Sequence, residues 1–288
     1  MARVLARRLG TGLPRHGGGH REGEGECRRR EGERGGRNIA SHRGEGNTPL
    51  LVSYPSSPVP KIDVIIPALD EERALPRVLE EIPGNLVRRV IVADNGSRDR
   101  TAEVALAAGA EVVSEPNRGY GAACLAALAH LADDPPDVVV FLDGDYSDHP
   151  AEMNRLVEPL LRGQADLVIG SRTLGRRERG SLTPQQLVGN AVACGVLRGV
   201  YGARYTDLGP FRAITWSALT ALEMRDENFG WTVEMQIKAA QIGLRHLEVP
   251  VAYRRRIGES KVSGTVKGTV LASGKILWTL ARYARPAS

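Results

Sequence analysis

From Lys61 onward, short runs of β-branched and other apolar residues alternate with stretches in which apolar residues recur at helical spacing. Nearly continuous apolar strands separated by helices are typical of a parallel sheet that helices cover on both faces. In such sheets, ligands bind beyond the carboxyl ends of the strands, where the loops meet. The sequence therefore predicts an α/β fold with a site at that edge. We expect strands at 63–66, 90–93, 111–113, 137–142 and 166–169, and helices after Asp70, from an N-cap at Asp99, and over 119–131 and 151–161.

The first sixty residues have a different composition from the rest of the chain. They contain 11 Arg, no Lys and 6 Glu, so they carry all of the net charge of +5. Residues 16–46 offer almost no apolar side chains to bury, which predicts a disordered Arg/Gly-rich tail over residues 1–60. The arginines suit either a solvated tail or an arm that binds nucleic acid or anionic lipid without sequence preference. The overall charge therefore indicates no specific nucleic-acid partner for the folded part.

Cysteine content and hydropathy indicate the compartment. Cys27, Cys124 and Cys194 are too few and too scattered for a disulfide framework or a zinc cluster, which is typical of a reducing compartment. No run of eighteen apolar residues occurs, and the N-terminus lacks the long hydrophobic stretch of a signal peptide. We expect a cytoplasmic protein that is either soluble or in peripheral contact with the inner face of the membrane.

Asp143-Gly144-Asp145 follows directly after the apolar run 138–142. Side chains in an extended backbone repeat their direction every second residue, so both carboxylates can face one point. Gly144 lets an anion approach the main chain. This pattern suits a hard divalent cation that takes its other ligands from phosphate oxygens and water. A solvated turn explains an isolated triplet of this kind equally well.

Two more acidic loops follow predicted strands. Pro67-Ala68-Leu69-Asp70-Glu71-Glu72 comes after the first strand, where acidic residues also suit the start of a helix. The 94–101 segment comes after the second strand, and Asp94 and Asn95 there offer hydrogen bonds to a base or ribose, although a tight Asn-Gly turn explains the same residues. Three acidic loops in order, each at the end of a strand, favour one shared site over unrelated turns.

As an ordered set, these segments resemble family 2 glycosyltransferases of the GT-A fold. The resemblance covers roughly residues 61–275 and is closest to polyprenyl-phosphate (dolichyl-phosphate) mannosyl and glucosyl transferases. It implies a Rossmann-like, mostly parallel sheet with helices on both faces, in a domain over residues 61–261. The segments that carry it are Val64-Ile65-Ile66-Pro67 with Glu71, the 94–101 segment, Asn117-Arg118-Gly119-Tyr120-Gly121-Ala122, Asp143-Gly144-Asp145, Gly170-Ser171-Arg172, 207–212, 231–235 and 254–261.

The resemblance also implies a donor site for a nucleotide sugar. Asp143 and Asp145 would hold Mg²⁺ or Mn²⁺ on the donor diphosphate. The family often has Tyr-Asn or Tyr-Asp where this chain has Leu69-Asp70, and a second Asp in place of Asn95, so the base remains open. The residues expected to line the nucleotide pocket are Pro67, Leu69, Glu71 and Asp94.

Cationic side chains are expected to stabilise the leaving diphosphate and to bind the acceptor. Arg is well suited to phosphate because its fork meets two oxygens at once. A hydroxyl acceptor needs a general base, for which Glu234 or Asp207 are the candidates, although Glu234 also suits a residue that only orients a helix. A phosphate acceptor instead needs positive charge. The candidates for the diphosphate are Arg255 or Arg256 with Lys261, and those for an acceptor phosphate are Arg172, Arg212 and the 176–179 loop.

Apolar residues at helical spacing predict a C-terminal amphipathic helix over residues 262–288. Such a helix either lies in a membrane interface or packs on its own domain, and the apolar stretch 191–201 has the same two interpretations. We expect a metal-dependent, inverting transfer of a hexose from a UDP- or GDP-sugar to polyprenyl phosphate. The alternatives are a soluble hydroxyl acceptor and a non-catalytic protein that binds nucleotide sugar or RNA.

Overall fold

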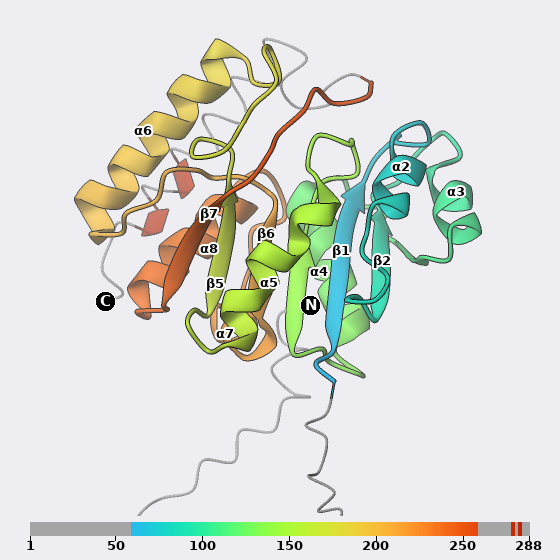
Figure 1. Cartoon of the computed structure of the whole chain (residues 1–288), viewed down its shortest axis with the longest axis horizontal. Helices are drawn as coiled ribbons and strands as arrows, with labels where there is room; N and C mark the ends of the chain where they lie inside the picture. Colours follow the sequence, from blue (N-terminus) through green and yellow to red (C-terminus); the bar gives the residue numbers. More distant parts are fainter. Residues whose placement is uncertain (1–58, 259–277, 280–281, 284–288) are drawn as a thin grey trace, which may run out of the picture. The chain divides into compact units, whose positions relative to one another are not determined.

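The apolar runs of the sequence form a seven-stranded sheet (Figure 1). The computed structural model describes residues 59–258, 278–279 and 282–283, and the expectations for the 1–60 tail lie almost entirely outside this part. The strand order is β3-β2-β1-β4-β6-β5-β7. The strands are β1 (Ile62–Ala68), β2 (Arg89–Asp94), β3 (Glu111–Ser114), β4 (Val138–Phe141), β5 (Leu167–Ser171), β6 (Arg212–Thr215) and β7 (His246–Pro250).

The sheet is parallel except at one strand, which confirms the predicted mostly parallel α/β fold. β1 pairs in parallel with β2 and β4, β2 with β3, and β5 with β7. β6 is antiparallel to both β4 and β5. Neither β6 nor β7 was predicted. β6 is only four residues long and begins with an arginine, and β7 is a mixed sequence without an apolar run, so neither carries a strong strand pattern.

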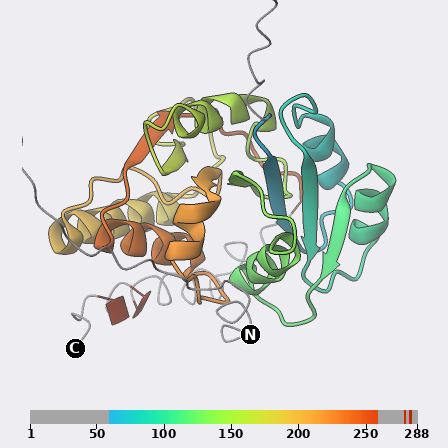
Figure 2. The same ribbon diagram turned by 90° about the horizontal axis from the view of Figure 1, so that it is seen from below.

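Helices cover both faces of the sheet (Figure 2). Along β1, Val64 and Ile66 join one apolar cluster with α2, α3 and α5, whereas Ile65 joins the other with α4, α6, α7 and α8. Both clusters are nearly free of solvent, as expected for strands buried on both sides. The helices are α2 (Leu75–Glu80), α3 (Thr101–Ala107), α4 (Tyr120–Leu131), α5 (Met153–Leu161) after a 3₁₀ turn (Pro150–Glu152), α6 (Pro184–Tyr201), α7 (Trp216–Ala221) and α8 (Trp231–Gln241).

The start of α3 differs by one residue from the expectation. Its N-cap is Arg100, not Asp99. Oδ1 of Asp99 still accepts the backbone N–H of Thr101 at 3.0 Å, and Oδ2 accepts the backbone N–H of Glu72 at 3.1 Å. The carboxylate thus stabilises the first turn from one position earlier and ties the loop after β1 to the loop after β2.

Only part of the predicted C-terminal helix lies in the described residues. Trp278, Thr279, Arg282 and Tyr283 are helical, and the Tyr283 hydroxyl donates to Oε1 of Glu234 at 2.6 Å. Within the described segments, no helix has both the length and the apolar character needed to cross a bilayer.

Candidate active site

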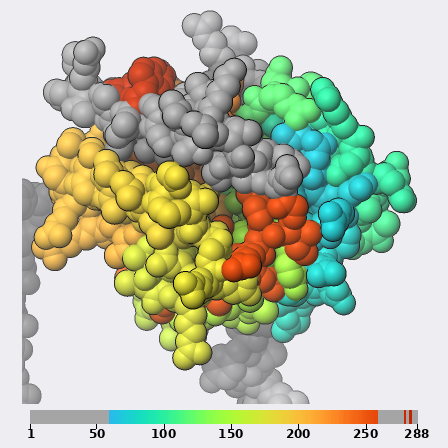
Figure 3. All heavy atoms as spheres, turned by 90° about the horizontal axis from the view of Figure 1, so that it is seen from above, coloured from blue at the N-terminus to red at the C-terminus, as the bar shows by residue number. Residues whose placement is uncertain are grey.

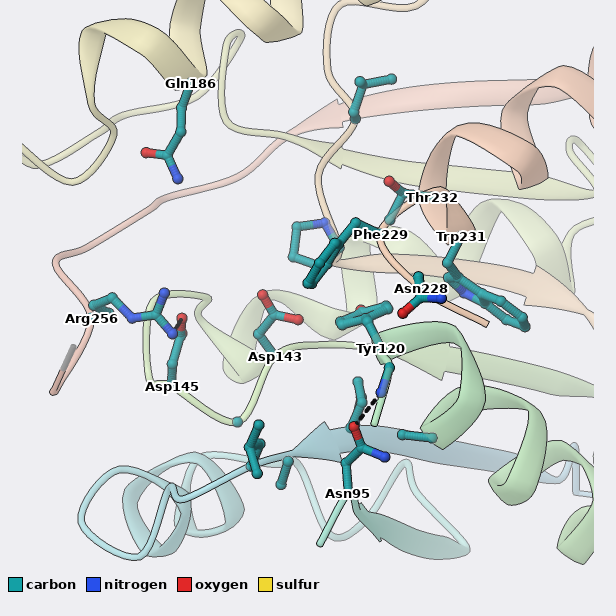
Figure 4. Close-up of a pocket in the computed structure, with 18 of the residues that line it drawn as sticks. Asn95, Tyr120, Asp143, Asp145, Gln186, Asn228, Phe229, Trp231, Thr232 and Arg256 are labelled. Atoms are coloured by element: carbon teal, nitrogen blue, oxygen red, sulfur yellow. Dashed lines mark hydrogen bonds and ion pairs between the residues drawn. The ribbon is translucent and has the colours of Figure 1, made fainter. Parts of the chain in front are cut away.

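A cavity of about 510 Å³ lies at the carboxyl ends of β1 and β4, the edge at which the sequence predicts a site. Its walls come from the loops after β1, β2 and β4, the N-terminal ends of α4 and α6, the start of α8 and the segment after β7 (Figure 4). The predicted site residues that line this one cavity include Pro67, Leu69, Glu71, Asp143, Asp145, Arg172 and Arg256.

The two carboxylates after β4 have different surroundings. Oδ1 of Asp145 accepts the backbone N–H of Ser147 at 2.8 Å, and Oδ2 lies 2.7 Å from Nη2 of Arg256. Oδ1 of Asp143 is buried and has no hydrogen-bond partner of good geometry in the described part of the chain, although the Tyr120 hydroxyl lies near this carboxylate. Asp145 is therefore directly paired with a cationic side chain, whereas Asp143 makes no ion pair within the described residues, although the charges of Arg256 and Arg172 reach it.

The charge at this point favours a cation. Burial, and then the neighbouring charge of Asp145, raise the pKa of Asp143 to about 7. Oδ1 of Asp148, behind Asp143, is also buried and has no donor among the described residues. Unsatisfied carboxylate oxygens fit a hard ion such as Mg²⁺ or Mn²⁺. No cluster of three His, Cys, Asp or Glu side chains that could hold a metal occurs in the described ranges, so a bound ion would take further ligands from a diphosphate and water.

The predicted nucleotide residues lie on one side of the cavity, with one exception. Asp94 is buried but does not line the cavity, and its Oδ1 accepts the backbone N–H of Ser97 at 3.2 Å. Asn95 lines the cavity in its place. The Asn95 amide donates to the carbonyl oxygens of Glu115 and Asn117 at 3.0 and 2.7 Å, and its oxygen accepts the N–H of Gly119 at 2.8 Å. Asn95 therefore holds the 117–119 turn against the pocket.

The three consecutive arginines after β7 have three different environments. Arg254 pairs with Glu81 at 2.8 Å. Arg255 donates to the carbonyl oxygen of Arg179 and does not line the cavity, which contradicts its expected place beside the diphosphate. Arg256 lines the cavity, lies 2.7 Å from Asp145, and its buried Nε has no acceptor in the described residues. Of the three, Arg256 is the one whose position fits a phosphate oxygen.

Arg172 also lines the cavity, and it is held rigidly. Its backbone N–H, Nε and Nη2 all donate to the carboxylate of Asp207, at 2.7, 2.9 and 2.6 Å. The Tyr253 ring lies 5.1 Å from its guanidinium carbon. Burial alone would lower the pKa of Arg172, but the charge of Asp207 raises it, so the guanidinium stays charged. The guanidinium is therefore charged and fixed in place, with Asp207 as its counter-ion.

Two predicted catalytic residues lie outside the cavity. Arg212 is fully buried and donates to the carbonyl oxygens of Leu208, Gly209 and Thr232, so it fixes the walls of the cavity and does not reach into it. Glu234 is also fully buried, 2.7 Å from Lys238, and accepts the backbone N–H groups of residues 225 and 226. Its position fits the orienting role weighed from the sequence. Lys261 lies outside the described residues.

One wall of the cavity was missed by the sequence reasoning. It is built where the start of α4 meets the 226–232 segment. A Cβ at Gly121 would lie 1.8 Å from the Asp226 carbonyl oxygen, so only glycine permits this close approach. The two glycines at 119 and 121 are the sequence feature that could have predicted this close approach. The lining residues not predicted include Tyr120, Asn228, Phe229, Trp231 and Thr232.

Comparison with known proteins gives relatives that match about three quarters of this chain and nearly the whole of their own length. The family model described as Glycosyl transferase family 2 matches residues 63–222. An uncharacterized glycosyltransferase of Mycobacterium tuberculosis is 38% identical over 213 residues, which cover 73% of this chain and 94% of the relative. An undecaprenyl-phosphate mannosyltransferase of Micrococcus luteus is 30% identical over 226 residues, covering 74% of this chain and 92% of that protein.

Solved structures agree with the sequence relatives. Glucosyl-3-phosphoglycerate synthase from Mycobacterium tuberculosis, crystallised with Mn²⁺, UDP and glucosyl-3-phosphoglycerate, matches with a TM-score of 0.63. That match is 28% identical and covers 80% of this chain and 82% of the synthase. Family model, relatives and fold therefore agree with the arrangement of acidic loops at the sheet edge, and the chain belongs to glycosyl transferase family 2.

Proposed function

We propose that this glycosyltransferase transfers a hexose from a UDP- or GDP-sugar to a polyprenyl phosphate. The observation that carries the choice of acceptor is the chemistry of the cavity walls. The carboxylates that line the cavity in the described residues are Glu71, Asp143 and Asp145, all on the donor side. The rest of the lining includes Arg172 and the neutral side chains Gln185, Gln186, Asn190 and Thr232, and we assign this part of the wall to the acceptor.

A hydroxyl acceptor and a phosphate acceptor place different demands on that wall. A hydroxyl must lose a proton as it attacks, which requires a base within hydrogen-bond reach. Both candidate bases are engaged elsewhere, because Asp207 is paired with Arg172 and Glu234 with Lys238. A phosphate monoester is already anionic, needs no base, and is attracted by a fixed guanidinium. The wall therefore favours the phosphate.

The proposed reaction follows from these groups. An oxygen of the acceptor phosphate attacks the anomeric carbon while the bond from that carbon to the diphosphate oxygen breaks. The nucleoside diphosphate leaves with the electron pair, and no proton has to move. Arg172 orients the acceptor phosphate, and Arg256 stabilises the charge that develops on the diphosphate. Attack from the side opposite the leaving group gives the inverted product that we expect.

Asp143 and Asp145 are the residues that would hold the divalent cation. When bound, such an ion supplies a charge that neutralises the diphosphate oxygens. Support comes from Oδ1 of Asp143, which has no hydrogen-bond partner among the described residues, and from the Mn²⁺ and UDP complex of the related synthase. Because that synthase binds UDP, a UDP-sugar is the first donor to test.

The proposal is tested with a labelled donor and two acceptors. Purified protein with Mn²⁺ and UDP-glucose, or in a second series GDP-mannose, is incubated with undecaprenyl phosphate or with 3-phosphoglycerate, and the products are partitioned into organic solvent. Label in the organic phase that depends on undecaprenyl phosphate supports the proposal, and the Asp145→Asn variant should abolish it. Transfer to phosphoglycerate alone would refute it.

A soluble phosphorylated acceptor is the second candidate function. It is favoured by the fold match to an enzyme whose name states a phosphoglycerate product. Arg172 would bind the phosphate of either acceptor, so the outcome of the partition experiment, and not the presence of this arginine, decides between them.

A further inference from the structure

α6 (Pro184–Tyr201) exposes an apolar face to solvent. Residues spaced along one side of this helix are exposed, including Leu187 at 38%, Val188 at 64% and Val192 at 48%. Ala191 and Gly195 lie on the same side and are also exposed. The opposite side packs into the core through Ala193, Cys194 and Leu197. A helix that is apolar on both sides is normally buried on both sides, and here the described residues cover only one of them.

The residues around this face are basic. Between Glu178 and Asp207 the chain has no acidic residue, but it has three exposed arginines, Arg179, Arg198 and Arg204. Arg198 lies on the apolar face itself, one turn beyond Gly195. An apolar helix face with arginines at its borders, in a segment that has no carboxylate, matches the chemistry of an interfacial helix on anionic lipid.

The face is continuous with the acceptor side of the cavity. The first two turns of α6 supply Gln185, Gln186, Gly189 and Asn190 to the cavity wall. Figure 3 shows α6 in yellow at the molecular surface, on the same side as the orange-red segment after β7 that carries Arg256. A surface that contacts the exposed face of α6 would therefore lie beside the mouth of the site.

The size of the face argues against a second copy of the chain as its occupant. An 18-residue helix is about 27 Å long and, with side chains, about 10 Å wide, so its face offers roughly 270 Å². A stable dimer needs about 800 Å² from each partner. A bilayer surface has no such requirement, because it accepts a single helix lying in its plane.

We propose that α6 docks this protein on an anionic phospholipid surface, with its apolar face in the headgroup region and its arginines on lipid phosphates. The inference does not depend on the identity of the acceptor, because it concerns attachment and not transfer. It does place the acceptor wall of the cavity at the bilayer surface, where a lipid-linked acceptor would be presented.

The experiment measures flotation of the full chain with vesicles of phosphatidylglycerol and phosphatidylcholine, or of phosphatidylcholine alone. The variant Val188→Gln with Val192→Gln removes two apolar side chains that lie outside the cavity wall. The matched control is Leu106→Gln with Ile242→Gln, which removes two equally exposed apolar side chains, 61% and 51%, on α3 and at the end of α8. Thermal shift with UDP and Mn²⁺ reports whether each variant keeps its donor site.

We expect the wild type and the control to float with the anionic vesicles, and the α6 variant to lose at least about tenfold in vesicle affinity, since each buried valine is a substantial share of interfacial binding. An Arg198→Gln variant should weaken binding and reduce its dependence on salt. Wild-type protein that does not float, or an α6 variant that floats equally well, would overturn the proposal.

Light scattering that finds a wild-type dimer and a monomeric α6 variant would overturn it too, by assigning the face to a second copy. Loss of the UDP thermal shift in wild type would count against the proposed function and not against docking.

Discussion

The ion pair between Arg172 and Asp207 has a matched counterpart elsewhere in the protein, which allows burial to be tested as a single variable. In both pairs, the backbone N–H, Nε and Nη2 of one arginine donate to one aspartate: at 2.7, 2.9 and 2.6 Å for Arg172, and at 3.0, 3.1 and 2.7 Å for Arg245 with Asp166. The side chains of the first pair are 13% and 1% exposed, and those of the second 58% and 25%.

Removing the aspartate should have unequal effects on the free energy of unfolding. Asp207→Ala leaves a buried guanidinium without its counter-charge, which costs about 3–5 kcal/mol. Arg172 borders the cavity and water can reach it there, so we expect the lower end, about 3 kcal/mol. Asp166→Ala breaks a solvated pair worth about 0.2–1 kcal/mol. For a domain of this size, Asp207→Ala should lower Tm by roughly 6–12 °C. Asp166→Ala should lower it by at most about 4 °C.

Urea unfolding followed by circular dichroism measures both variants, and an unchanged m-value shows that the folded and unfolded states stay comparable. The double variant Arg172→Met with Asp207→Leu removes both charges and should recover much of the loss. Equal destabilisation by Asp207→Ala and Asp166→Ala would refute the reasoning. A double variant as unstable as Asp207→Ala would show that the unpaired charge is not the cause.

Three further predictions concern single groups. Arg256→Gln should weaken Mn²⁺-dependent binding of a UDP-sugar by roughly tenfold, because a charge-assisted hydrogen bond to the donor is lost. The control Arg255→Gln should change this affinity little, and calorimetry measures both. Equal effects would contradict the assignment of Arg256 to the diphosphate. The hydrogen bond from Arg254 is the main cause that lowers the pKa of Glu81. The ionised Glu81 therefore stabilises the folded state at pH values above its ordinary pKa of 4.5. This stabilisation is lost as pH falls through the pKa of Glu81 in the folded state. Glu81→Gln should therefore lower Tm most at pH 7, by a difference that narrows as pH falls below 4.5, and a difference independent of pH would contradict this. Burial raises the pKa of the Cys194 thiol to about 12, so little reactive thiolate is present at pH 8. Alkylation of Cys194 at pH 8, measured by peptide mass spectrometry, should therefore be slow until the protein unfolds. Rapid labelling of the native protein would be inconsistent with the fold.

Much of the donor side could be predicted from local pattern. β1 and β4 are apolar runs with polar residues directly after them, and parallel pairing of these strands brings Leu69, Asp143 and Asp145 to one edge. Asp94 shows the limit of that reasoning. It ends β2 as expected, but its side chain turns to the backbone N–H of Ser97, and the next residue, Asn95, lines the cavity.

The acceptor side could not be predicted to the same degree, because its residues are defined by partners far away in the sequence. Arg212 begins β6, which pairs antiparallel with β4 and β5, and this pairing places the guanidinium under the cavity instead of inside it. The wall made by α4 and the 226–232 segment depends on two backbones in contact at Gly121, and such contacts leave no periodic signal.

The sequence by itself determined the five apolar strands β1 to β5, the edge of the sheet at which the cavity lies and the pair of aspartates after β4, because strand periodicity and strand ends are properties of neighbouring residues. Only the tertiary structure decided which cations serve the site. Arg254, Arg255 and Arg256 are chemically identical and adjacent, yet one pairs with Glu81, one with a backbone carbonyl and one with Asp145. The direction of a long side chain is set by the partners that the fold brings to it, and those partners lie many residues away.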